Sequence, residues 1–351
     1  PEISQGTLQA IFEFQSLISL LTGMDVSNAS HYDGATAAAE AVILANHHFR
    51  GKRSKILLSR AINPRYREVI RSYMQANDEI HIVGDDPETG IEPDLKNLIA
   101  QIDLDTSLVM VQYPDFFGRI IDYKPLIETA HAQGALVAVV VNPTALALLT
   151  PPGEIGADIV VGEGQPLGIP LSYGGPYLGF FAVKNPLLRK ISGRLVGETV
   201  DTQGELAYVL TLTAREQHIR REKASSNICS NQGLMALAAT IYMTLLGKTG
   251  FQQVANLCYQ NAHYAANAVQ EIPGFKLPFK STPFFHEFVV QAGQNFPGLL
   301  AYLQDHGILG GYDLSQDYPE LEGCLLMAVT EMISREDIDY LTDVLSEVEH
   351  A

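Results

Sequence analysis

Short runs of consecutive apolar residues alternate with segments of helical periodicity over the first half of the chain. The apolar runs, which we expect to form buried strands, lie at 56–59, 80–83, 108–112, 136–141, 159–161 and 178–183. The periodic segments, which we expect to form helices, lie at 5–21, 37–44, 64–75, 95–102 and 123–133. Strands that are apolar on both faces and separated by helices predict a mostly parallel sheet with helices on both sides.

The pattern changes after Lys184. Strand-like residues at 209–213 precede a charged segment at 215–223 that we expect to be helical, and a long apolar helix at 231–246 then joins two domains. The remaining residues predict helices at 251–270, 297–305 and 335–348 and strands at 285–290 and 324–330. We therefore expect a large α/β domain at 1–226 and a small α/β domain at 227–351.

The composition of the 351 residues is typical of a soluble globular protein. A formal charge of −17 argues against nucleic acid and anionic membranes as partners, because both require a basic face. No run reaches the roughly 18 apolar residues of a membrane span. Three widely spaced cysteines, Cys229, Cys258 and Cys324, predict a reducing compartment, and we expect the cytoplasm. The chain begins with Pro1 and not with methionine, and we expect that its natural beginning has been removed.

A glycine-rich loop follows the apolar run at 159–161. It contains Gly162, Gly164 and Gly168, whose spacing differs from that of the dinucleotide-binding fingerprint. Pro166 and Pro170 exclude the helix that such a fingerprint needs for binding a pyrophosphate.

The arrangement of strand, glycine loop and returning strand resembles the way in which pyridoxal-phosphate enzymes of the aspartate aminotransferase fold present their Schiff-base lysine. Here the sequence contains no lysine between Lys124 and Lys184. Gln165 stands in the lysine slot, and an amide cannot form an imine. The pattern indicates the fold of a cofactor-dependent enzyme that lacks the lysine needed to bind the cofactor covalently.

A polar turn precedes the alanine-rich helix, and Asp33 is its expected N-cap. Gly34, Ala35 and Thr36 follow, and in enzymes of this fold the corresponding turn binds the cofactor phosphate through backbone amides. A capped alanine-rich helix explains the same residues without any ligand. Both interpretations stay open at this point.

The charged segment carries Arg215, His218 and Arg221, which recur every three residues and would share one face of a helix. This face is either a solvated, ion-paired surface or one that meets a carboxylate, a phosphate or a partner subunit. Asn227 is expected to cap the long helix that follows.

Several long and particular segments carry a family resemblance. They lie at 1–6, 32–36, 112–118, 162–176, 193–197, 215–221 and 226–229. By these segments the chain is identified as a member of the glycine decarboxylase family, the pyridoxal-phosphate P-proteins of the glycine cleavage system. It is similar to their N-terminal half, or alpha subunit, over essentially its whole length.

The resemblance implies fold type I of the pyridoxal-phosphate-dependent transferases, with a degenerate cofactor site. In the family two homologous halves pair, and the other half carries the lysine. The resemblance therefore implies no catalytic residue and no cofactor on this chain, and pyridoxal phosphate on a beta subunit. The position of the acid that binds the pyridine nitrogen falls at 140–142, which contains no carboxylate. The family pattern also implies a tyrosine-rich segment upstream of Pro1.

The implied partners are the beta subunit in a heterotetramer, glycine, and the lipoylated H-protein that receives the aminomethyl group after decarboxylation. The residues that the resemblance places by position at the active-site wall or subunit seam are His31, Tyr32, Arg194, Arg215, His218, Arg221 and Asn227. No metal site is expected, because no cluster of His, Cys or carboxylate residues has ligand spacing.

Two other functions stay open. The chain could be a catalytically inactive homologue that acts as a scaffold or regulatory partner. Co-purification of a subunit that carries a pyridoxal lysine would distinguish this function from that of a glycine decarboxylase subunit. An independent pyridoxal enzyme would need a lysine from elsewhere in the chain to enter the pocket.

Overall fold

The computed structural model describes residues 4–92, 95–293 and 298–348, and the chain divides into two compact units. The first unit comprises Pro1–Tyr113 and Asp122–Phe251, and the second comprises Pro114–Ile121 and Gln252–Ala351.

The sequence placed the division between residues 226 and 227, well before the boundary at 251. The residues after 226 belong to the first unit because hydrogen bonds tie them to it. The Gln232 amide donates to Ser30 Oγ over 2.8 Å, and the side-chain amide of Asn231 donates to the Ala29 carbonyl over 3.2 Å. Such polar side-chain contacts between distant segments leave no pattern in the sequence.

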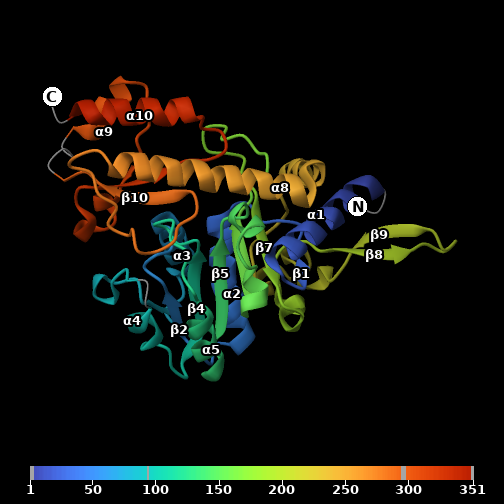
Figure 1. Ribbon diagram of the computed structural model, residues 1–351. Helices are drawn as coiled ribbons and strands as arrows, with labels where there is room; N and C mark the ends of the chain where they lie inside the picture. The colour runs from blue at the N-terminus through green and yellow to red at the C-terminus, as the bar shows by residue number, and fades with distance from the viewer. Residues whose placement is uncertain (1–3, 93–94, 294–297, 349–351) are drawn as a thin grey trace. The chain divides into compact units, whose positions relative to one another are not determined.

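The described part of the first unit contains a seven-stranded sheet in the order β1-β7-β6-β5-β4-β2-β3 (Figure 1). Its strands are β1 (Val26–Ser27), β2 (Lys55–Leu58), β3 (His81–Val83), β4 (Thr106–Tyr113), β5 (Leu136–Val141), β6 (Ile159–Glu163) and β7 (Gly179–Val183). Strands β2 to β6 pair in parallel, whereas β7 runs antiparallel to both β6 and β1. The predicted mostly parallel sheet is confirmed.

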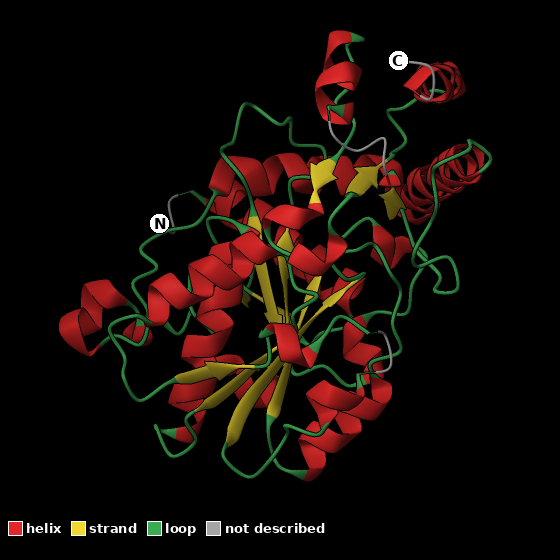
Figure 2. Cartoon of the chain, turned by 90° about the vertical axis from the view of Figure 1, so that its left-hand side faces the viewer, coloured by secondary structure: helices red, strands yellow, loops and turns green. Residues whose placement is uncertain are grey.

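Helices lie on both sides of these strands (Figure 2). They include α1 (Gln5–Thr22), α2 (Gly34–Phe49), α3 (Pro64–Met74), α4 (Lys96–Ile99), α5 (Lys124–Ala132) and α6 (Pro152–Ile155). On one face of the sheet, Ile56, Leu58 and Met110 share a core with the alanine face of α2 and with α3. The alternate residues Leu57 and Val109 point to the other face and are fully buried too.

A two-stranded ribbon, β8 (Val196–Val200) and β9 (Leu206–Leu210), projects from the first unit (Figure 1). Its base packs against α1 through Val196 and Tyr208. Val200 and Leu206 near its tip are 63% and 60% exposed.

A long helix, α8 (Gly233–Gln270), stands in place of the predicted helices at 231–246 and 251–270. Gly247, with φ 58° and ψ −173°, is non-helical and interrupts it, which explains the gap between the two predictions. Among the described residues, α8 is the one helix that is long and apolar enough to cross a bilayer, whereas the sequence pattern indicated no such run. Core helices of soluble proteins can have the same composition.

The second unit holds a three-stranded antiparallel sheet in the order β10-β12-β11 within its described residues. The strands are β10 (Glu287–Gln291), β11 (Tyr312–Asp313) and β12 (Cys324–Ala328), and the helices after α8 are α9 (Leu299–Asp305) and α10 (Arg335–Glu347). The start of the predicted helix at 297–305 lies outside the described residues, and its remainder is confirmed. A capping box between Ser334 and Asp337 begins α10.

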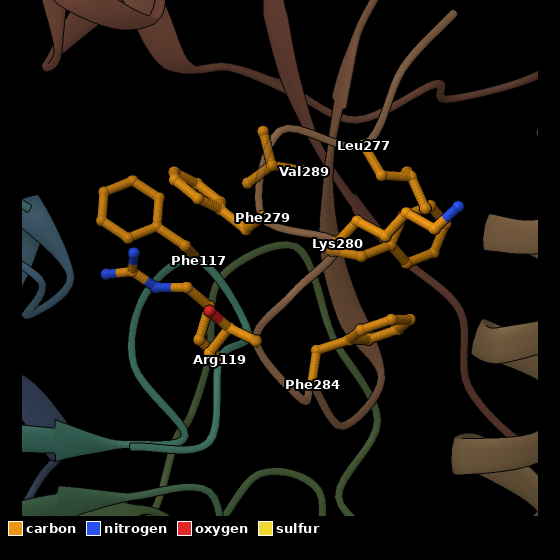
Figure 3. Close-up of a pocket in the computed structure, with 9 residues that line it drawn as sticks. Phe117, Arg119, Leu277, Phe279, Lys280, Phe284 and Val289 are labelled. Carbon is orange, nitrogen blue, oxygen red and sulfur yellow. The ribbon is translucent and has the colours of Figure 1, made fainter. Parts of the chain in front are cut away.

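A buried ion pair organises the turn at residues 114–118 of the second unit. Asp115 Oδ2 lies 2.8 Å from Arg119 Nη2, and both side chains are at most 2% exposed. The Arg119 guanidinium lies 4.9 Å and 4.6 Å from the ring centroids of Phe117 and Phe279 (Figure 3). The neighbouring cavity of about 20 Å³ has room for about one water molecule, so this turn forms a structural feature and not a ligand pocket.

Asp115→Asn should lower the free energy of unfolding by about 3 kcal/mol or more, because it leaves the Arg119 cation buried without a counter-charge. Urea denaturation followed by circular dichroism measures this loss. The matched control is Glu68→Gln in the Arg65–Glu68 pair, whose side chains are 57% and 59% exposed. That control should cost less than about 1 kcal/mol. Equal losses in the two variants would contradict the assignment.

Candidate functional site

Gln165 uses its side chain to close its own loop. Its Nε2 donates to the Ile169 carbonyl over 2.5 Å, and the Ile169 amide donates back to the Gln165 carbonyl over 3.1 Å. The Gln165 amide donates to Glu163 Oε1 over 3.0 Å. The next lysine in the sequence, Lys184, donates to the Gly23 carbonyl over 3.1 Å. The expected lysine slot is therefore filled by an amide that is already hydrogen-bonded.

The carboxylate of Glu163 joins this loop to the start of α2. Its Oε2 accepts from the Gly34 amide over 2.9 Å, and its Oε1 accepts from the Leu178 amide over 2.9 Å. Burial raises the pKa of Glu163, although these backbone donors act in the opposite direction. Asp33 and Thr36 form a capping box in which the Thr36 amide donates over 2.8 Å, which confirms the predicted N-cap. Two of the first three amides of α2 thus bind the chain's own carboxylates.

The space in front of Gly34 is filled as well. A Cβ atom on Gly34 would collide with the hydroxyl of Tyr66 from α3 and would lie 2.8 Å from the Glu163 amide nitrogen. Burial raises the pKa of Tyr66, so its hydroxyl stays neutral. A phosphate here would displace Tyr66 and face the negative charge of Glu163. The turn at Gly34, Ala35 and Thr36 does not fit a cofactor phosphate, and the capped-helix interpretation accounts for it.

The end of β5 also lacks the group that a pyridine ring would need. Val140 and Val141 are buried, and Asn142 Oδ1 accepts from the Thr144 amide over 2.9 Å. No carboxylate stands at these three positions to balance the charge of a protonated ring nitrogen.

His31 is fully buried beside β7. Its amide donates to the Gly179 carbonyl over 2.8 Å, and its ring centroid lies 5.0 Å from that of Phe181. Ser192 Oγ lies 3.0 Å from His31 Nε2, whereas Nδ1 has no partner among the described residues. Burial lowers the pKa of His31 to about 3, so the ring is neutral at neutral pH. His31 therefore contributes a neutral, buried ring that packs on Phe181 and contacts Ser192.

Glu40 lies in the middle of α2 and is 1% exposed. Burial raises its pKa to about 7, while hydrogen bonds with Ser226 and Ser192 lower it. Ser192, whose Oγ lies 3.0 Å from His31 Nε2, is thus also close to Glu40, whose Oε2 has no partner among the described residues. Glu40 is not among the predicted site residues, although it is the single charged residue within an apolar run at 37–45.

Arg215 holds the main chain at residues 191–193. Its Nη2 donates to the Gly193 carbonyl over 2.7 Å, and its Nη1 donates to the Ile191 carbonyl. Burial lowers the pKa of the guanidinium. Within the described chain its Nε has no partner, and neither has Oε1 of the neighbouring buried Glu216. Arg215 therefore belongs to the same partly satisfied polar cluster as His31 and Glu40.

The predicted charged helix at 215–223 is wrong. A single helical turn, α7 (Gln217–Arg220), lies between 3₁₀ turns at Thr213–Arg215 and Arg221–Lys223. Arg221 adopts φ 53° and ψ −125°, outside the right-handed helical region, and therefore ends the turn. Arg215, His218 and Arg221 consequently do not form one helical face.

Among the other residues of the predicted seam, His218, Arg221 and Asn227 are exposed and Arg194 is half-buried. The His218 side chain is 58% exposed and its Nδ1 lies 3.6 Å from Glu216 Oε2, while Arg221 and Asn227 are exposed too. The predicted cap at Asn227 is wrong, because α8 begins at Gly233. Arg194 contributes its carbonyl, which accepts from the Ala29 amide over 2.9 Å.

Tyr32 connects the residues before α8 to the start of α2, since its hydroxyl accepts a hydrogen bond from the Cys229 amide over 3.0 Å. The structure therefore brings His31, Tyr32, Arg215 and the main chain of Arg194 together near the turn that precedes α2. It leaves His218, Arg221 and Asn227 exposed on the segment 217–227. In the part of the chain that is described, no group of three His, Cys, Asp or Glu residues could hold a metal ion.

Comparison with known sequences gives a consistent result. Residues 1–345 match the family of the glycine cleavage system P-protein. A relative from Geobacillus thermodenitrificans, named probable glycine dehydrogenase (decarboxylating) subunit 1, is 52% identical over 99% of this chain and 76% of its own length. A relative of the same name from Desulforamulus reducens is 53% identical over 97% of this chain and 75% of its own length. The chain spans about three-quarters of these relatives.

Solved structures agree with the sequence comparison. Glycine decarboxylase (P-protein) of the glycine cleavage system, crystallised in inhibitor-bound form, is 41% identical with a TM-score of 0.92, over 99% of this chain and 77% of that one. Sphingosine-1-phosphate lyase from Burkholderia pseudomallei is 14% identical with a TM-score of 0.70, over 98% of this chain and 77% of that one, and this likeness concerns the fold alone. The predicted fold type I is confirmed.

Glu40→Gln should remove a pH-dependent loss of stability. A carboxyl whose pKa rises from 4.5 to about 7 on folding stays protonated in the folded state while it ionises in the unfolded state. Rising pH between these values therefore favours unfolding, by about 3 kcal/mol at most. From about pH 5 to about pH 8 the variant should gain this amount relative to the wild type in urea denaturation. A difference that stays constant with pH would contradict the assignment, and Glu154→Gln, at an exposed position, is the control.

Proposed function

The chain belongs to the glycine cleavage system P-protein family, and on that premise we propose that it is the subunit of glycine dehydrogenase (decarboxylating) that carries no cofactor. Pyridoxal phosphate is held on a second subunit, where it supplies the electron sink for decarboxylation of glycine. This chain completes the active site from its own side and performs no covalent step.

The observation that carries the proposal is that the chain's own groups occupy both halves of the cofactor site. Gln165, hydrogen-bonded within its loop, takes the place of the lysine, and the Glu163 carboxylate takes the Gly34 amide. A carboxylate at a helix N-terminus gains the same favourable interaction with the helix dipole that a phosphate would. Loss of the lysine alone would leave a phosphate site, whereas here that site is filled too.

The chain contributes positioned polar groups to the assembled enzyme. The segment that carries His218, Arg221 and Asn227 is anchored on one side by Arg215 and on the other by the Cys229 amide. In the assembly the cations of this segment face the second subunit and the anionic ligands of that subunit, which include the carboxylate of glycine.

The remaining partners follow from the family. The name subunit 1 of the relatives supports a second subunit as the main partner. The complex passes the aminomethyl group to the lipoylated H-protein and works in the cytoplasm. The charge of −17 supports the absence of nucleic acid and of anionic membrane from the partners.

The purified chain should show no imine absorption band with pyridoxal phosphate beyond that of the free cofactor, and no exchange of labelled CO2 with the carboxyl group of glycine. Adding the second subunit should produce both signals. The second subunit alone is the control, and full activity in that control would favour the scaffold or regulator function. A borohydride-trapped imine in this chain alone would overturn the proposal.

Gln165→Ala should leave the CO2 exchange rate of the two-subunit enzyme within about tenfold of the wild type, because the carboxamide only closes a loop. The measurement is kcat and KM for glycine in the reconstituted pair. A fall of several orders of magnitude in kcat with unchanged KM would instead place Gln165 at the reacting atoms.

A further inference from the structure

One face of the first four turns of α8 is apolar and exposed. Leu234, Leu237, Ile241 and Leu245 are 72%, 40%, 50% and 82% exposed. Their spacing of three or four residues places them on one face of the helix. The opposite face is buried, as at Ala239. We call the four exposed side chains the α8 stripe.

The α8 stripe has the properties of a protein interface. The fifteen residues from 233 to 247 include no charged side chain, although an exposed helix face normally carries charge. Contiguous exposed apolar side chains mark interaction sites. Although α8 is long and apolar enough to cross a bilayer, a membrane fits less well, because one side of the helix is already buried in protein. An acidic chain is also repelled by anionic lipids.

The α8 stripe begins next to the degenerate cofactor site. Immediately before it, the Gln232 amide donates to Ser30 Oγ over 2.8 Å, just ahead of the turn that begins α2. Within the stripe's length, Tyr242 packs against the loop that carries Gln165, since a Cβ on Gly168 would lie 2.6 Å from the Tyr242 ring. The same loop exposes Leu171 at 70%. The exposed apolar side chains of the α8 stripe and of Leu171 therefore lie beside the Gln165 loop.

We propose that the α8 stripe seats the second, cofactor-bearing subunit, whose site then lies beside the Gln165 loop. The inference rests on the proposed function, because the subunit numbering of the relatives supplies the partner. It adds the surface on which that partner binds. An obligate subunit interface is typically apolar at its centre, as this stripe is.

The test compares two substitutions at positions of matched exposure on the same helix, Ile241→Glu in the stripe and Leu257→Glu beyond Gly247, which are 50% and 48% exposed in the wild type. Binding to the second subunit is measured by titration calorimetry, and circular dichroism checks the folding of each variant. Ile241→Glu should weaken binding about 100-fold or more, because it buries an unpaired charge. Leu257→Glu should change the affinity by less than about threefold, and Ile241→Ala should weaken it about tenfold.

The outcomes separate the two proposals. If the wild-type chain fails to bind the second subunit, the proposed function is overturned together with the inference. If Ile241→Glu binds like the wild type, the inference alone is overturned. The inference is also overturned if Ile241→Glu abolishes a homodimer of the lone chain or binding to phospholipid vesicles while association with the second subunit persists. The same holds if the variant destabilises only a longer natural chain whose added segment covers the stripe.

Discussion

The carboxylate of Glu163 is the contact on which the site depends. It accepts hydrogen bonds from the amides of Gly34, Gln165 and Leu178, which come from the start of α2, the glycine loop and the residue before β7. A partly buried carboxylate with three backbone donors is well satisfied without any ligand. One side chain therefore fixes the loop, completes the helix N-terminus and removes the place where a phosphate would bind.

A second polar cluster has the opposite character. His31, Ser192, Glu40 and Arg215 connect α2, the residues before β8 and the segment that leads to α8. Several of their atoms have no partner among the described residues. Buried polar groups left unsatisfied are costly. The first unit thus combines a self-satisfied turn at the start of α2 with a neighbouring polar cluster that is tied to the segment 217–227.

The sequence predicted the sheet, most of its helices and the family, because apolar runs and helical periodicity record burial directly. The absence of a lysine between Lys124 and Lys184 was also visible in the sequence. The role of Glu163 was not, since two of its three donors, the amides of Gly34 and Leu178, come from residues distant in sequence. The helix predicted for the charged segment at 215–223 was wrong, because residue spacing alone suggested a helix where the backbone turns at Arg221. Glu40 carried a detectable signal, a lone charge in an apolar run, that was not used.

The most direct test of the central claim is borohydride reduction of the active two-subunit enzyme with pyridoxal phosphate, followed by mass spectrometric mapping of the labelled peptides. If this chain holds no cofactor, we expect one reduced pyridoxyl lysine per pair of chains, located on the second subunit, with every lysine of this chain unmodified. A stoichiometric pyridoxyl label on any lysine of this chain would contradict it.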